Sequence, residues 1–255
     1  HFKNATGLIS GDNDRLIIFP LKFNNGEGWC QTRIAFDYGE KTAPLKISGH
    51  VEEINASVLH QDLFNRQGLV TGHLKGDFYL EGNPDNDHFW QTARGGIHIQ
   101  INDGTLRKFN GLAKVFSLLN VSQIFAGKLP DMDSEGMPFT LLESSVQFGN
   151  GKAATKDFKM TSEAMNLSLV GAHDLADDTL DFILGVMPLR TVDKIITSIP
   201  IAGWVLAGEN KALITAHFKI EGASANPQVT AIPIDSVSDT VFGVFKRTLG
   251  LPGKL

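Results

Sequence analysis

The sequence has little of what disulfide-linked, membrane-spanning or nucleic-acid-binding proteins need. Its single cysteine, Cys30, excludes a disulfide within the chain and is expected to be a packed thiol. No apolar run reaches the roughly 18 residues of a membrane-spanning helix. The net charge is −5, and no cluster of Lys and Arg offsets it locally. Because phosphate binding needs a basic surface, nucleic acid is excluded as an expected partner.

Motifs for catalysis and for cofactor or metal binding are also missing. The chain has no phosphate-binding loop, no dinucleotide GxGxxG, no GxSxG, no HExxH and no CxxC. Its eight histidines are dispersed, and none has the spacing and acidic support of a metal site. Two acidic pairs, Glu52-Glu53 and Asp177-Asp178, lie in or beside predicted turns and are interpreted as solvated charge. We therefore expect no catalytic residue, no cofactor and no metal.

Phenylalanine is the one abundant aromatic residue. The chain has 17 Phe, but only 2 Tyr and 3 Trp. Phe carries no polar group, so these rings need fully apolar surroundings. They indicate either a large core or a surface that contacts acyl chains.

Alternation of apolar and polar residues is the dominant pattern and predicts strands. The alternating series are Ile34, Phe36, Tyr38; Leu74, Phe78, Leu80; Ile97, Ile99, Ile101; Met165, Leu167, Leu169; Leu180, Phe182, Leu184, Val186; and Ala212, Ile214, Ala216, Phe218, Ile220. Predicted turns separate them at 24–26, 82–85, 102–104, 149–151 and 177–178, where Asn, Asp and Gly favour tight hairpins. Short turns imply an antiparallel meander with one apolar and one polar face.

Three segments have helical periodicity instead. The first spans residues 106–126 and the second residues 190–206. The third spans residues 236–249, with Asp235 or Ser236 as its expected cap and Lys246 and Arg247 near its end, where cations suit the helix dipole. The predicted fold is therefore mainly β with a few amphipathic helices (α+β).

A series of five weak motifs resembles the C-terminal region of the AsmA-like family, of AsmA/YhdP/TamB type. They are "GGIHIQINDGTLRKFNGLAKVFSLLNV", "GMPFTLLESSVQFGNGKAATKDFKM", "MNLSLVGAHDLADDTLDFILGVMPL", "IPIAGWVLAG" and "FKIEGASANPQVTAIP". Together they cover about residues 95–233, and their order carries the resemblance. The helix from Ser236 and the "GLPGKL" end are a departure that resembles only some branches of the family.

The resemblance implies a bacterial periplasmic protein that an N-terminal helix outside this chain anchors in the inner membrane. It further implies a long, open, taco-like antiparallel sheet with an apolar lining, a role in phospholipid movement between inner and outer membranes, support of outer-membrane integrity, and no enzymatic activity. The chain starts at His1 without a signal peptide, so we expect part of a longer protein. We expect one segment over 1–255, with groove-type strands at 1–94, the AsmA-like region at 95–233, and a C-terminal helix and tail at 234–255.

Our first hypothesis is lipid handling, with phospholipid or another acyl lipid as the partner. The candidate groove residues are Ile97, Ile99, Ile101, Leu167, Leu169, Phe182 and Leu184. Because an apolar sheet face must be covered, either lipid tails or the chain's own helices can cover it. The alternative is a closed sandwich or barrel without lipid cargo.

Our second hypothesis is a docking module for a membrane surface or an envelope protein. Its candidate residues on the C-terminal helix are Val241, Phe242, Phe245 and Leu249. Only two basic residues accompany them, which is few for binding anionic lipid, and a helix that caps the end of the sheet is the alternative. A third class, a hydrolase of envelope polymers, is also left open.

Overall fold

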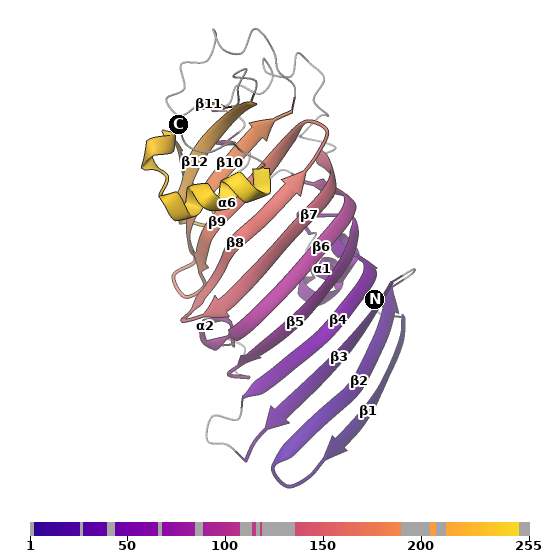
Figure 1. The fold of residues 1–255 in the computed structure, drawn as a ribbon. Helices are drawn as coiled ribbons and strands as arrows, with labels where there is room; N and C mark the ends of the chain where they lie inside the picture. The colour runs from indigo at the N-terminus through magenta and orange to yellow at the C-terminus, as the bar shows by residue number, and fades with distance from the viewer. Residues whose placement is uncertain are drawn as a thin grey trace.

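The chain folds into one open antiparallel sheet in a computed structural model that describes residues 3–25, 28–39, 44–65, 68–84, 89–107, 114–115, 118, 136–189, 205–207 and 213–249. Thirteen strands follow the order β1-β2-β3-β4-β5-β6-β7-β8-β9-β10-β12-β11 among these residues, with β13 also on β12. Each strand up to β10 pairs with its neighbours in the chain, and Figure 1 shows β1 and β11 at opposite ends of the sheet. The predicted mainly β, antiparallel, open and curved architecture is confirmed.

The strands from β1 to β10 and β12 have 9 to 13 residues, whereas β11 and β13 are short. Their bounds are β1 Lys3–Gly11, β2 Arg15–Asn25, β3 Gly28–Asp37, β4 Leu45–Asn55, β5 His73–Gly82, β6 Arg94–Leu106, β7 Met137–Gly149, β8 Lys152–Thr161, β9 Met165–Asp174, β10 Thr179–Pro188, β11 Val205–Ala207, β12 Leu213–Ala223 and β13 Gln228–Ile232. The helical elements are α1 Ala56–Phe64, α2 Phe89–Thr92, the 3-10 turn η1 Ile234–Ser236 and α6 Asp239–Leu249.

The pairing register places the apolar residues of successive strands in cross-strand rows. One row runs Ile18, Ile34, Ile47, Leu80 over β2–β5. A second row runs Leu74, Ile101, Leu142, Met160, Leu167, Val186, Ala216 over β5–β12. Successive residues of a strand point to opposite sides, so one side of the sheet collects these rows. We call it the apolar face and the opposite side the polar face.

Two of the predicted turns show how Asn, Asp and Gly act in this sheet. The Gly149-Asn150-Gly151 turn is confirmed between β7 and β8, where Asn150 and Gly151 both adopt positive φ (52° and 72°). The turn at 102–104 is wrong, because these residues lie inside β6. There Asp103 has φ 49°, and the pairing with β7 continues from Asn102–Leu141 to Gly104–Phe139 without a register shift. A left-handed residue inside a strand and one in a turn have the same backbone conformation, so the residue types alone do not separate them.

The helices match the prediction in part. The C-terminal helix is confirmed as α6, but its cap is Ser238, whose hydroxyl accepts a bond from the Val241 N–H, rather than Asp235 or Ser236. The other two predicted helices lie mostly outside the described residues. Where they are described, Leu106 is the last residue of β6, Lys114, Val115 and Leu118 are helical, and residues 205–207 form β11. The helices α1 and α2 were not predicted.

Candidate functional site

The apolar face in the N-terminal half of the sheet is lined by large aliphatic and aromatic side chains that protein covers only in part. On the first two strands, Ile9 leaves 71% of its surface exposed and Leu16 leaves 38%. Ile34 and Ile47 are opposite each other on β3 and β4, and both are only partly buried. The other residues of this surface are Ile18, Phe36, Leu45 and Phe78, again exposed in part. We call this surface the open half of the apolar face.

Helix α1 lies at one end of β4 and β5, on the apolar face. The Asn55 side chain caps it by accepting hydrogen bonds from the backbone N–H groups of Ser57 and Val58. Its Leu59 packs against a small buried cluster that contains Cys30 and Val51. Burial raises the pKa of the Cys30 thiol, as expected for a packed, unreactive cysteine.

Helix α2 follows the other end of β5. The Phe89 ring lies over Gly82, where an added Cβ would come within 3.1 Å of the ring. Trp90 contacts Phe148 of β7, with the ring centroids 5.9 Å apart. The two short helices therefore stand at opposite ends of β5 and mark the boundary of the open half.

Beyond β5 the same face is closed by protein. Its buried cluster includes Leu142, Met160 and Phe218, and Val115 packs among them with no exposed surface. Lys114 beside it donates hydrogen bonds of 2.7 Å to the Asn226 side chain and to the Pro227 carbonyl, next to β13. We call this region, from β6 to β13, the closed half.

The predicted groove residues lie on the apolar face of β6, β9 and β10, and therefore in the closed half. Six of them belong to its cluster: Ile99, Ile101, Leu167, Leu169, Phe182 and Leu184. Ile97 lies in the row between Phe78 and Val146. Their contact with lipid stays a prediction. The accessible lining of the open half, Ile9, Leu16, Ile18 and Ile47, was not among the candidates, although the alternation of Ile34 and Phe36 marked one of its strands.

The residues predicted for docking face their own sheet. Phe245 and Leu249 are buried against Met187, while Val241 and Phe242 are half-buried in the same cluster. Helix α6 lies on the polar face, in front of the sheet in Figure 1. This apolar stripe would reach a membrane or a partner only after α6 left the sheet.

The seat of α6 combines apolar and hydroxyl contacts. The Phe245 ring stacks on the buried His217 of β12, with centroids 5.4 Å apart and planes at 28°. The hydroxyls of Ser168 and Thr248 hydrogen-bond at 2.6 Å. The sequence of β10 indicates this packing. Ile183 and Met187 make the strand apolar on both sides, which is typical of a strand that is covered on both faces.

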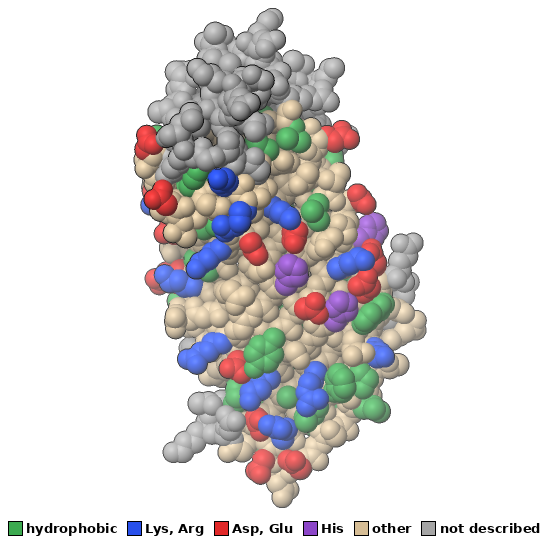
Figure 2. All heavy atoms as spheres, viewed as in Figure 1, with side chains coloured by type: hydrophobic (Ala, Val, Ile, Leu, Met, Phe, Trp, Pro, Cys, Tyr) green, Lys and Arg blue, Asp and Glu red, His purple; other side chains and the backbone are tan. Residues whose placement is uncertain are grey.

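The rest of the polar face carries interleaved charges of both signs (Figure 2). Lys75 bonds Glu52 and Glu53 at 2.8 Å each, and these carboxylates raise the pKa of its ammonium group. The Glu52-Glu53 pair therefore lies within β4, at a bulge, and not in a turn. His50 bonds Asp77 at 2.8 Å and Glu52 at 3.3 Å, which raises the pKa of its imidazole. These side chains are accessible to solvent, and none of the pairs is shielded from water as acid-base chemistry requires.

Comparison with known protein families decides the relationship. The family described as YhdP protein matches residues 12–229, from the end of β1 into β13. The chain belongs to the YhdP family. The AsmA-type resemblance is thereby confirmed, and the match extends further toward the N-terminus than the five motifs. No curated protein and no solved structure matches the chain.

YhdP proteins are associated with the periplasm and the cell envelope, in a context of lipid transport, and are not an enzyme family. Across the described part of the chain, no helix is long and apolar enough to cross a membrane. Within the same residues, no three His, Cys, Asp or Glu side chains are grouped to hold a metal ion.

Proposed function

We propose that this chain is a non-enzymatic, lipid-handling segment of a periplasmic protein that is anchored in the inner membrane outside this chain. Its apolar face takes acyl chains of phospholipids during their transfer between inner and outer membranes, and so supports outer-membrane integrity. The observation that carries the proposal is the open half of the apolar face, with the exposed Ile9 and Leu16 and the row through Ile34 and Ile47.

The free energy of burying an acyl chain is large enough for an apolar surface to bind lipid without specific polar contacts. Each buried CH₂ contributes about 0.8 kcal/mol, so a sixteen-carbon chain gains on the order of 10 kcal/mol when fully covered. That gain competes with a bilayer without any polar recognition. The closed half offers no comparable surface at Leu142, Met160 or Phe218, because protein already covers them. Lipid is therefore proposed to occupy the region from β1 to β5.

The experiment is native mass spectrometry of the purified chain after incubation with phosphatidylethanolamine and phosphatidylglycerol vesicles. The wild type is expected to carry phospholipid. The double variant Ile34→Asn, Ile47→Asn is expected to carry several-fold less, because two amides then interrupt the row between Ile18 and Leu80.

The matched control is Ile17→Asn, the same change on β2 but on the polar face, where Ile17 pairs with Ala35. It is expected to retain lipid at the wild-type level. A wild type that neither copurifies with lipid nor takes it from vesicles contradicts the proposal. Equal lipid loss in the control would place the lipid elsewhere.

A further inference from the structure

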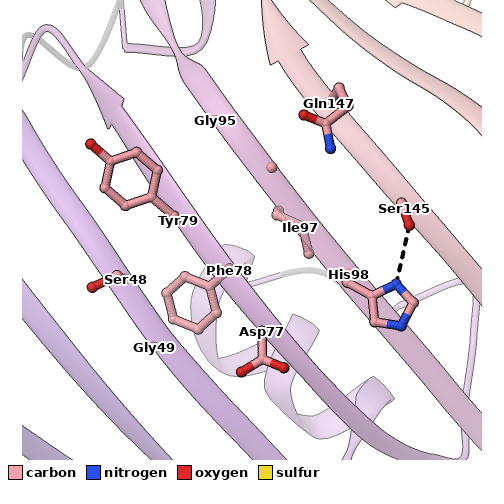
Figure 3. Close-up of a pocket in the computed structure, with 11 residues that line it drawn as sticks. Ser48, Gly49, Asp77, Phe78, Tyr79, Gly95, Ile97, His98, Ser145 and Gln147 are labelled. Carbon is pink, nitrogen blue, oxygen red and sulfur yellow. Dashed lines mark hydrogen bonds between the residues drawn. The ribbon is translucent and has the colours of Figure 1, made fainter.

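A hollow lies on the polar face, in the middle of the sheet, apart from the surface proposed for lipid. It spans β4 to β7 and lies on the opposite side of the sheet from the apolar rows. The residues that line it include Ser48, Asp77, Tyr79, His98, Ser145 and Gln147 of the polar face, together with Gly49, Phe78, Gly95, Gly96 and Ile97. Figure 3 shows Asp77 and Tyr79 on β5, with the Tyr79 ring on the side of β4 and with His98, Ser145 and Gln147 on β6 and β7.

Glycine makes this hollow. The register pairs Tyr79 with Gly96, and Gly96 with Gln147, so the central strand contributes only backbone between two large side chains. On the other side, Tyr79 pairs with Ser48, which is also small. An added Cβ at Gly96 would lie 2.8 Å from the Gln147 amide nitrogen. The Tyr79 ring therefore has a small neighbour on each side, and the Gln147 amide lies over the main chain of Gly96.

The rim of the hollow offers both donors and acceptors. Ser48 and Gln147 make no side-chain hydrogen bond within the described residues. His98 and Ser145 hydrogen-bond each other at 3.1 Å, which leaves one ring nitrogen of His98 uncommitted in that contact. Asp77 bonds His50 through one oxygen, and its side chain is 72% exposed. A ligand with many hydroxyl groups can satisfy this mixed set.

Tyr79 supplies the apolar element. It is 47% exposed, and its hydroxyl donates a 2.7 Å hydrogen bond to Glu81. That bond raises the pKa of the phenol, so the ring stays neutral. The fixed ring presents a flat apolar surface beside polar groups, as binding sites for amphipathic ligands do.

The charge of the rim selects the class of ligand. No Lys or Arg lines the hollow, while the carboxylate of Asp77 does. Phosphates and other anions are disfavoured there, and so is nucleic acid. Sugars combine neutral hydroxyls with an apolar ring face, and exposed strands bind oligosaccharides in other β folds. We propose that this hollow binds a neutral glycan, with Tyr79 under a sugar ring and Gln147, Ser48 and Asp77 on its hydroxyls.

The test is calorimetric titration of the full chain with chitotetraose and with cellotetraose, and with inorganic phosphate as the anionic probe. At least one of the two glycans is expected to bind, and phosphate is not. Tyr79→Ala is expected to weaken glycan binding at least tenfold and Gln147→Ala several-fold. Both positions are exposed, and circular dichroism will confirm that each variant is folded.

The matched control is Gln100→Ala, on the polar face of β6 outside the hollow, where Gln100 bonds Asn102. It is expected to bind glycan as the wild type does. Absence of binding to both glycans overturns the proposal, and so does unchanged binding in both hollow variants or binding of phosphate alone. Phospholipid carried by the same variants reports on the apolar face separately, so failure of one proposal is distinguishable from failure of the other.

Discussion

On β2, Leu16 leaves more than a third of its surface exposed, whereas on β12 Phe218 leaves none. Both belong to the same apolar face and to strands with the same alternation. In the closed half, Val115 packs among the apolar side chains of the strands, and these side chains are buried. In the open half, the rows through Ile34 and Ile47 have no such cover among the described residues.

The difference teaches that alternation fixes which side of a strand is apolar but not what covers it. A strand with one apolar side is equally compatible with a protein core and with a lipid surface. The closed half has the packing of a domain core. The open half leaves comparable residues available for a ligand.

The sharpest test of this comparison is the same substitution in both halves. Phe218→Ala in the closed half is expected to lower the free energy of unfolding by about 3–5 kcal/mol, since it leaves a cavity in a full core. Phe36→Ala in the open half is expected to lower it by less than about half as much, because Phe36 is only partly buried. Urea unfolding measures both values, and equal losses would break the distinction.

In the closed half, helix α6 also covers the polar face of the sheet. Phe245→Ala is expected to cost about 3 kcal/mol, because the fully buried ring fills the space between α6 and His217. Lys246→Ala, exposed on the neighbouring position, is expected to stay within about 0.5 kcal/mol of wild type. Urea unfolding with a proteolysis assay of the C-terminus checks this, and no loss in the first variant would show that α6 contributes nothing to the closed half.

The smallest expected effect concerns pH on the polar face behind the open half. Asp77 and Glu52 hold the pKa of His50 above its ordinary value of 6.5. The stability from these contacts is therefore fully present below that value and is lost as pH rises through the folded-state pKa. Imidazole NMR titration is expected to show the raised pKa, and Asp77→Asn is expected to lower it. An unchanged titration in that variant would contradict the assigned cause.

Much of the fold could be predicted because hairpins are local. Ile97, Ile99 and Ile101 do share a face, and Asn150-Gly151 does form a turn. The order of five weak motifs over residues 95–233 was enough to predict the family. The predicted turn at Asp103 is wrong, because Asp and Gly favour a left-handed backbone both in turns and at this position inside β6.

What covers each face could not be predicted, since cover is a long-range property. Val115 meets strands far from it in the chain, and Phe245 meets β10 and β12. Helix α1 is only nine residues long and its apolar residues do not gather strongly on one face, so its periodicity is faint, although Asn55 is a typical cap. The hollow depends on Gly96 lying between Tyr79 and Gln147, a register that no single strand reveals.

The neighbour-to-neighbour order of β1 to β10 also governs how such a protein changes length. Strands in a sheet are about 4.8 Å apart, so each inserted hairpin lengthens the apolar face by roughly 10 Å and disturbs only the two strands at the insertion point. Two strands bring the chain back to the edge it left, whereas one strand would move every later loop to the opposite edge. The length of the sheet is therefore expected to vary in pairs of strands. The packing of Val115 and α6 on the closed half is expected to stay the same.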